Sequence, residues 1–165
     1  MSARYARYGP LGALRRQRGL AMVEFAISAP VILLLMFGTF EFGRLMTEYS
    51  ALNDGVRNAA RYMAGKALSG SGGGMLTGTQ WSTLVTEGTN LAVFGNIGGT
   101  PPAILPGLIG TNITMSEDTA AGTITVAADY PYTSLFGGSA IPTFFMGGSL
   151  STAYRLKIST TMKAL

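Results

Sequence analysis

An apolar run near the start of the chain limits what the protein can fold into. From Leu20 to Phe40 the sequence holds a single charged residue, Glu24. As an α-helix these residues would span about 31 Å, close to the thickness of a bilayer core. The uncharged part that follows Glu24 would span only about 24 Å, so we expect this acid near one interface. A carboxylate at the midplane would cost roughly 2.5–3.5 kcal/mol.

The positive charges are concentrated before this run. Residues 1–19 contain five arginines and no acid, whereas residues 20–165 contain the other seven Lys and Arg and all eight Asp and Glu. Arginines that precede an apolar helix predict a cytoplasmic N-terminus and an exported remainder. A nucleic-acid-binding protein would gather its basic residues on the folded surface, so no nucleic acid is expected as a partner.

The residue types also limit the chemistry. The chain contains no cysteine and no histidine. Disulfides, zinc sites built from Cys or His, and Ser-His or Cys-His catalytic pairs are therefore excluded. The remaining acids of the second half show no paired motif, so we expect no catalytic residues, no metal, no cofactor and no enzyme. These acids are Glu87, Glu117, Asp118 and Asp129.

Two ordinary interpretations of the apolar run can be weighed first. A cleaved secretory signal peptide needs a small-x-small site after the apolar core, but residues 36–42 read MFGTFEF, which is bulky and then charged. An uncleaved signal anchor fits the length and the charge, but it leaves Gly19 and Glu24 unexplained. It would make the chain a single-pass, membrane-anchored sensor or binding module with an extracytoplasmic head.

A third interpretation begins at residues 18–25, RGLAMVEF. A glycine, four mostly apolar residues, a glutamate and an aromatic residue resemble the processing site of type IV pilin-like proteins. The longer strings RGLAMVEFA, LLLMFGTFEFGRL and ALNDGVRNAARYMA resemble the TadE family of pseudopilins, which belong to the tight-adherence (Flp-type) pilus machinery of bacteria. The resemblance is specific over residues 15–64 and looser in the rest of the chain.

This resemblance implies a processing site and a set of partners. A prepilin peptidase would cut between Gly19 and Leu20 on the cytoplasmic side, and Glu24 and Phe25 would belong to the assembly and processing motif. The chain would reside in the bacterial inner membrane and later in the pilus, outside the cell. Its partners would be that peptidase, other pilin or pseudopilin subunits and the pilus assembly machinery. It would be a minor pilin or pseudopilin that joins, primes or caps a pilus for adherence.

Processing would explain why an acid is present in the apolar run. Cutting would create an ammonium at Leu20, and a neighbouring copy with an axial offset could pair its Glu24 with that charge. Pairing lowers the cost of a buried charge and fixes register. Alternatively, Glu24 lies in the headgroup layer and pairs with Arg18 or lipid. Pro30 removes one helical hydrogen bond, so it either kinks the assembled helix or is a harmless proline of a membrane helix.

The apolar helix is expected to continue into the remainder of the chain. Apolar residues follow the spacing of an amphipathic helix as far as Ala67. The polar residues of this part mostly fall off the stripe, namely Glu48, Asn53, Asp54, Arg57 and Arg61. We divide the chain into a basic leader (1–19), a long helix (20–68), a Gly/Ser linker (69–79) and a small head (80–165). The stripe contains Phe42, Leu45, Met46, Tyr49, Leu52, Val56, Ala59, Ala60, Met63 and Ala67.

The head is expected to complete an α+β fold with about three antiparallel strands. A second helix is predicted over 80–94 and weakened at Gly88, followed by a Gly/Pro-rich loop over 95–110. Alternation predicts strands at 112–116, 123–130 and 150–162, with a hairpin turn around 117–122. Residues 131–148 are predicted to form a long loop. Its Phe136, Phe144, Phe145 and Met146 form either a subunit contact or a cover for one end of the sheet.

Overall fold

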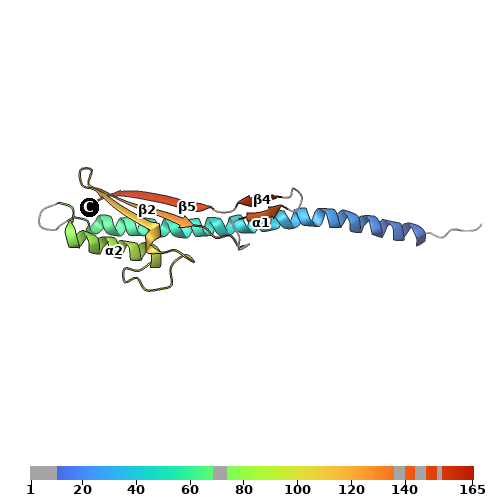
Figure 1. The fold of residues 1–165 in the computed structure, drawn as a ribbon, viewed down its shortest axis with the longest axis horizontal. Helices are drawn as coiled ribbons and strands as arrows, with labels where there is room; N and C mark the ends of the chain where they lie inside the picture. Colours follow the sequence, from blue (N-terminus) through green and yellow to red (C-terminus); the bar gives the residue numbers. More distant parts are fainter. Residues whose placement is uncertain (1–10, 69–73, 136–139, 144–147, 152–153) are drawn as a thin grey trace, which may run out of the picture. The chain divides into compact units, whose positions relative to one another are not determined.

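In the computed structural model the chain folds into two compact units, Met1–Phe42 and Gly43–Leu165. The structure describes residues 11–68, 74–135, 140–143, 148–151 and 154–165. Helix α1 (Leu11–Lys66) contributes to both units (Figure 1). The expected α+β layout is confirmed: a long N-terminal helix, a second helix and a three-stranded antiparallel sheet.

The second unit, which we call the head, adds the remaining elements to the C-terminal half of α1. Helix α2 (Gly78–Phe94) is followed by a loop and a short 3₁₀ turn, η1 (Gly110–Asn112). Strands β1 (Ile113–Asp118), β2 (Thr123–Pro131) and β5 (Arg155–Lys163) form an antiparallel sheet in the order β1-β2-β5. Strands β3 (Ala140–Thr143) and β4 (Gly148–Ser151) form a separate two-stranded sheet.

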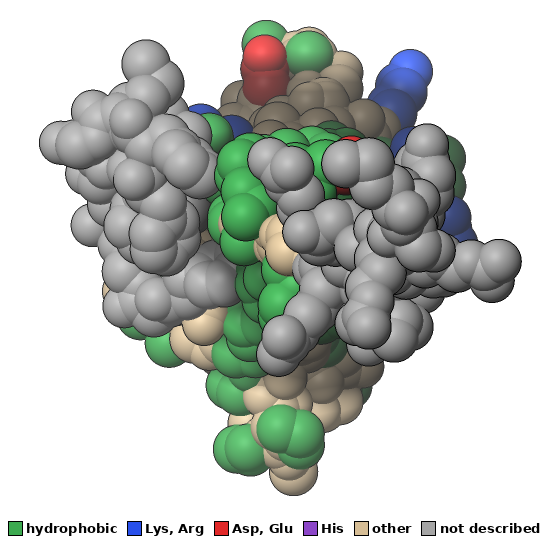
Figure 2. Space-filling model, turned by 90° about the vertical axis from the view of Figure 1, so that its right-hand side faces the viewer, with side chains coloured by type: hydrophobic (Ala, Val, Ile, Leu, Met, Phe, Trp, Pro, Cys, Tyr) green, Lys and Arg blue, Asp and Glu red, His purple; other side chains and the backbone are tan. Residues whose placement is uncertain are grey.

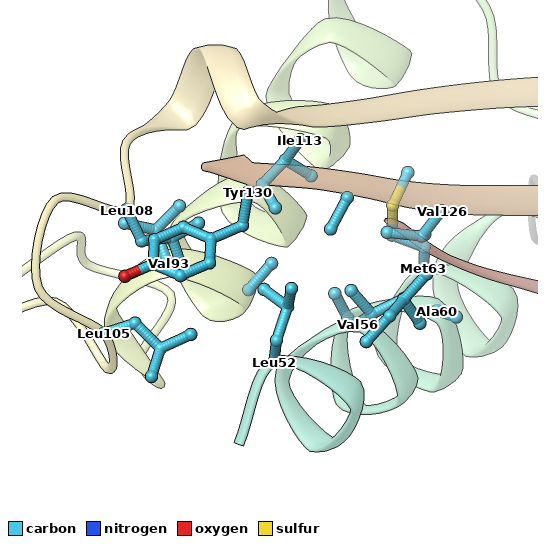
Figure 3. Close-up of a cluster of buried hydrophobic side chains, with 14 of the residues drawn as sticks. Leu52, Val56, Ala60, Met63, Val93, Leu105, Leu108, Ile113, Val126 and Tyr130 are labelled. Carbon is cyan, nitrogen blue, oxygen red and sulfur yellow. The ribbon is translucent and has the colours of Figure 1, made fainter. Parts of the chain in front are cut away.

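The core of the head lies between the three-stranded sheet and the two helices (Figure 3). Leu52, Val56 and Met63 of α1 are completely buried there, as the amphipathic spacing predicts. From the sheet, β2 contributes every second residue, including Val126 and Tyr130, so the period of two is confirmed as well. The predicted stripe is wrong at its start, because Phe42, Met46 and Tyr49 are exposed.

The connections around the sheet follow from local chemistry. The predicted turn between β1 and β2 is confirmed: Oδ1 of Asp118 accepts hydrogen bonds from the N–H groups of Ala120 and Ala121, each at 3.0 Å. Gly122 completes the turn with a φ of 64°, a left-handed conformation that glycine adopts without a steric cost. At the other end of the sheet, Nδ2 of Asn112 donates to the carbonyl of Asp129 at 3.1 Å.

Two predictions about the strands are wrong. The expected strand 150–162 is divided, because β2 ends at Pro131, which is paired with Arg155. Residues further upstream therefore have no partner in β2, and residues 148–151 pair instead with 140–143. Strand β3 thus lies within the segment predicted to be a long loop. Phe136, Phe144, Phe145 and Met146, for which we predicted a contact or covering role, lie outside the described residues.

The predicted weak point at Gly88 is also wrong, since α2 runs through it without interruption. Gly88 is buried, and a Cβ atom there would lie 2.8 Å from Sδ of Met63. The glycine therefore permits close approach of α2 to α1. Gly55 has the same function on α1, where a Cβ atom would lie 2.9 Å from the carbonyl oxygen of Ala92.

Gly55→Ala should destabilise the head. The new methyl group would meet a backbone carbonyl that cannot move away without shifting α2, and such overpacking typically costs about 1–3 kcal/mol. The measurement is denaturant unfolding of the detergent-solubilised full chain, followed by the fluorescence of Trp81. Gly65→Ala is the matched control. A Cβ atom there meets nothing within 4 Å, so higher helix propensity should stabilise by roughly 0.5–1 kcal/mol. Equal unfolding midpoints for the two variants would contradict the packing argument.

Candidate functional site

The residues predicted for processing and assembly all lie on the exposed surface of α1. Gly19, Leu20, Glu24 and Phe25 occupy consecutive turns of the helix, and Leu20 and Phe25 are 72% and 69% exposed. Within the described part of this unit, therefore, no packing contact requires these side chains. Their predicted roles concern a peptidase and neighbouring subunits, so they stay predictions.

The rest of this unit presents an apolar surface. None of the residues from Gly19 to Phe42 is buried, and the large apolar side chains of the segment are mostly exposed. Figure 2 shows hydrophobic side chains gathered in the centre of the face that it presents. By length and composition, this segment of α1 could cross a membrane. The exposed side chains include Met22, Val23, Ile27, Val31, Ile32, Leu33, Leu34, Leu35, Met36, Phe37 and Phe40.

The two hydroxyl side chains of this segment are compatible with an apolar environment. The hydroxyl of Thr39 donates to the carbonyl of Leu35 at 2.8 Å. The hydroxyl of Ser28 donates to the carbonyl of Phe25 at 3.3 Å. Hydroxyls bonded to their own helix need no water. Pro30 lies inside α1, which is helical on both sides of it. The predicted kink in an assembled state stays a prediction.

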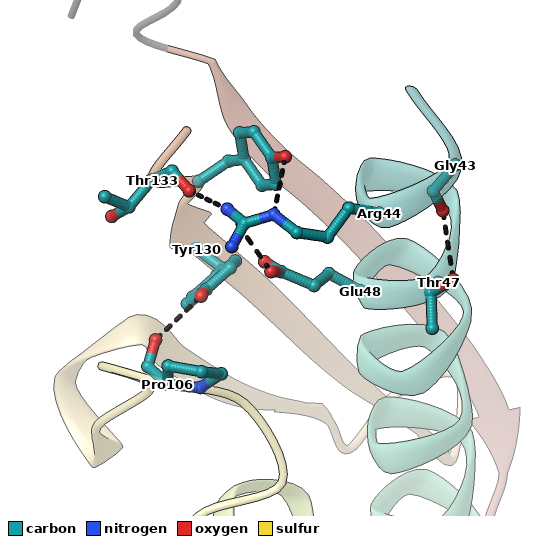
Figure 4. Close-up of polar contacts among 8 residues, drawn as sticks. Gly43, Arg44, Thr47, Glu48, Pro106, Tyr130 and Thr133 are labelled. Carbon is teal, nitrogen blue, oxygen red and sulfur yellow. Dashed lines mark hydrogen bonds and ion pairs between the residues drawn. The ribbon is translucent and has the colours of Figure 1, made fainter. Parts of the chain in front are cut away.

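A polar cluster begins directly after the apolar segment, at the start of the head (Figure 4). Nε of Arg44 donates to the hydroxyl of Tyr132 at 3.2 Å, and an Nη group donates to the carbonyl of Thr133. The guanidinium carbon also lies 5.1 Å from the centre of the Tyr132 ring, a cation–π contact. A single side chain of α1 thus holds the segment that follows β2.

Glu48 is the acidic member of this cluster. Its Oε1 lies 3.7 Å from an Nη atom of Arg44, one helical turn away. Only 8% of Glu48 is exposed, so its predicted position off the buried stripe is wrong. Glu48 projects toward the end of the sheet, where the polar groups of Arg44 and Tyr130 lie near it (Figure 4). No hydrogen-bond donor among the described residues reaches its other oxygen, Oε2.

Tyr130 connects the cluster to the loop after α2. Its hydroxyl donates to the carbonyl of Pro106 at 2.7 Å, and its ring is buried in the core. Burial, followed by the negative charge of Glu48, raises the pKa of the Tyr130 hydroxyl from its ordinary value of 10.0 to about 12. The tyrosine is therefore held neutral, as a hydrogen-bond donor.

A second polar cluster joins the two helices at the far end of α1. The hydroxyl of Tyr62 donates to Oε2 of Glu87 at 2.6 Å and accepts a hydrogen bond from Nζ of Lys66 at 2.5 Å. The hydrogen bond to Tyr62 is the main cause that raises the pKa of Lys66, and the charge of Glu87 adds to it. Lys66 is exposed, whereas Tyr62 and Glu87 are half-buried between the two helices, so we assign this cluster to helix packing.

The described residues contain no group of three or more His, Cys, Asp or Glu side chains that could hold a metal ion. What the geometry does define is a protein with one exposed apolar helix, which fits a membrane anchor, and a small α+β head packed on the continuation of that helix. An exposed apolar surface of this kind suggests assembly or anchoring.

The comparison with known families agrees with this class. Residues 19–61 match the family described as TadE-like protein. The match supports a TadE-like protein of the Tad/Flp pilus system, as the sequence resemblance suggests. No curated protein and no solved structure shows significant similarity to the chain.

The matched segment combines the two surfaces described above. It begins at Gly19, includes the exposed apolar helix and continues through Arg44 and Glu48 into the buried stripe of the head. The sequence resemblance included Arg44 in the string EFGRL but assigned it no contact. Its spacing of four residues from Glu48 was the available signal, whereas its contacts with Tyr132 and Thr133 depend on the tertiary fold.

Removing the Tyr130 hydroxyl should change stability in two ways. Tyr130→Phe loses the hydrogen bond to Pro106, which typically costs about 0.5–1.5 kcal/mol at neutral pH. In the native chain, the folded pKa lies above the unfolded one. The stabilisation from the neutral tyrosine is thus fully present below about pH 10 and is lost as the pH rises toward about 12.

The free energy of unfolding of the variant should therefore fall less steeply over this alkaline range than that of the native chain. Denaturant unfolding between pH 8 and pH 12 measures both effects. Tyr154→Phe is the control, because Tyr154 is exposed and should change neither the neutral stability nor the slope. A native slope in Tyr130→Phe would contradict the assignment.

Proposed function

We propose that this chain is a minor pilin or pseudopilin of a Tad/Flp-type pilus. In this proposal a prepilin peptidase cuts it after Gly19, and it then joins, primes or caps a pilus used for adherence. Its role would be structural and not catalytic. Its partners would be the peptidase, other pilin or pseudopilin subunits and the assembly machinery.

One observation carries the proposal. The family-matched segment, residues 19–61, is a helix whose first half exposes an apolar surface with a lone carboxylate and whose second half forms part of a folded core. An apolar helix can be accommodated by lipid or by the helices of other subunits. A pilin needs both environments, since it waits in the membrane and then enters a filament.

Gly19 supports processing at this position. A Cβ atom there would meet nothing within 4 Å, and the φ of Gly19 is not positive. Neither packing nor backbone geometry requires glycine. The sequence resemblance supplies a reason, since a peptidase that cuts after Gly19 would select this residue.

Glu24 supports the assembly step. Its exposed carboxylate lies one helical turn from Leu20 and projects from the apolar surface. After the proposed cut, the α-amino group of Leu20 in one copy can pair with Glu24 of another, which reduces the cost of both charges in an apolar environment. The uncut chain lacks this amine, so cutting would license assembly.

The proposed location follows from the charges before the helix. Five arginines in residues 1–19 would keep this end in the cytoplasm, and the head would lie on the outer side of the inner membrane. After processing, the head would be exposed on the pilus, outside the cell.

Intact-mass measurement of the chain recovered from bacterial membranes tests the processing step. The expected product begins at Leu20. A chain that retains residues 1–19 when the cognate prepilin peptidase is present would favour the alternative, a membrane-anchored sensor or binding module that is never cut. A strain that lacks the peptidase is the control and should yield only the longer chain.

Glu24→Gln tests the pairing mechanism. The variant should insert into the membrane and be cut as the native chain is, because the apolar run and Gly19 are unchanged. Its recovery in sheared filaments should fall at least about tenfold, since a neutral amide cannot pair with the amine of Leu20. Asp54→Asn, at an exposed position of the same helix, should have no effect. Undiminished incorporation of Glu24→Gln would remove Glu24 from the mechanism.

A further inference from the structure

The three-stranded sheet of the head has two open edges. Strands β1 and β5 are its outer strands, and no other described strand pairs with their outer sides. Such an edge presents backbone N–H and C=O groups that can pair with another chain. The two edges are different strands, so they can complement each other without being identical.

The two edge strands run in the same direction and are in register with the same residues of β2. Both β1 and β5 are antiparallel to β2, so they run in the same direction. Ile113 and Ile158 are both paired with Ala128, and Asp118 and Lys163 at the other end are both paired with Thr123. A second head displaced sideways would therefore place its β1 beside β5 of the first, as a parallel pair over six residues.

The exposed side chains of the two edges are compatible at this register. On the solvent face, β1 carries two hydroxyls and then an acid, and β5 carries two hydroxyls and then a base. Opposite charges on neighbouring strands stabilise a pair, and small hydroxyls leave the backbones accessible. The facing pairs are Thr114 with Ser159, Ser116 with Thr161, and Asp118 with Lys163.

The two edges also carry opposite charges: β5 is basic and β1 is acidic. Strand β5 carries Arg155, Lys157 and Lys163. The first two bind Asp129 within the same head, whereas no ion pair involves Lys163 within the described part of the chain. Strand β1 carries Asp118 and Glu117, and no described donor reaches the buried Oε2 of Glu117. An acidic edge and a basic edge attract each other but repel a copy of themselves.

We propose that the β1 edge of one head pairs with the β5 edge of a second copy of this chain. This inference rests on the proposed function, in which Leu20 of one copy pairs with Glu24 of another and so brings two heads of this chain together. Because the two edges are different surfaces, the contact is heterologous, and each added head leaves one edge free for the next. Contacts of this kind build open chains, whereas identical patches build closed dimers.

The proposed contact is weak, so we expect it between heads held together in a membrane or filament and not between free heads in solution. A parallel pair of six residues with one exposed ion pair is weak, since such a charge pair adds little in water. Anchored helices would raise the local concentration of heads, which converts a weak contact into a populated one. Edge pairing is thus expected in membranes and filaments.

Cysteine cross-linking tests the pairing directly, because the chain has no cysteine of its own. Thr114→Cys and Ser159→Cys are expressed as two differently tagged full-length chains in one cell, and the membranes are oxidised. Neighbouring strands lie about 4.7–4.9 Å apart, within the range that a disulfide can bridge. We expect a dimer that carries both tags. No mixed dimer, or equal amounts of β1–β1 or β5–β5 dimers, would overturn the proposal.

Two controls separate edge pairing from random collision. Asn58→Cys, exposed on α1, should give no product with Thr114→Cys. Lys163→Glu, added to the Ser159→Cys chain, should lower the yield of mixed dimer by roughly threefold or more, because it places two acids opposite each other. Arg57→Glu, which changes the charge of an exposed residue of α1 by the same amount, should leave the yield unchanged. Asp118 is not substituted, because it accepts the hydrogen bonds of the β1–β2 turn.

The mass of the same chains distinguishes this inference from the proposed function. Chains that begin at Leu20 but give no mixed dimer would overturn edge pairing and leave the proposed function standing. A mixed dimer between chains that retain residues 1–19 would support edge pairing and contradict the proposed processing.

Discussion

The close approach of α1 and α2 is the constraint on which the head depends. Gly55 lets the carbonyl of Ala92 come within contact distance of α1, and Gly88 lets Met63 fill the space against α2. The two helices together with the sheet then enclose one core, with Leu52 and Val56 on one side and Val126 and Tyr130 on the other. A larger side chain at either glycine would separate the layers that make this core continuous.

Helix α1 has an exposed apolar half and a half that packs in the head, and its residue types change between the two. Up to Phe42 it exposes apolar side chains, and the few hydroxyls bond back to the helix. From Arg44 onward, polar side chains reach the sheet and the loop after it, and Leu52 begins the buried stripe. The Arg44–Glu48 cluster marks this change. Its polar groups would be poorly placed in lipid, so it limits how far the apolar half can extend.

Much of this architecture could be predicted from periodicity, because helices and half-buried strands carry a repeating pattern. The stripe from Leu52 to Ala67 and the alternation of β2 were predicted correctly. The errors occur where a partner decides the outcome. Gly88 is a poor helix former by itself, yet it lies where Met63 requires space. Leu150 continues the alternation of β5, but β2 is too short to pair with it.

The candidate site divides in the same way. The motif around Gly19 and Glu24 could be found by resemblance because it is local in sequence, and the family match covers it. The contacts of Arg44 with Tyr132 and Thr133 join residues that are nearly ninety positions apart. Spacing along a single helix shows that Arg44 can reach Glu48. It carries no information about contacts with Tyr132 and Thr133, which follow β2 in the sequence.

The continuity of α1 has a mechanical consequence. All residues from Leu11 to Lys66 are helical, so the boundary between the two units falls within a helix. Tension applied to the apolar half would pass along a hydrogen-bonded backbone directly into the helix that supplies the core of the head. The load would fall on buried side chains such as Leu52 and Val56, so the folded head itself would resist a pull on the apolar half of the helix.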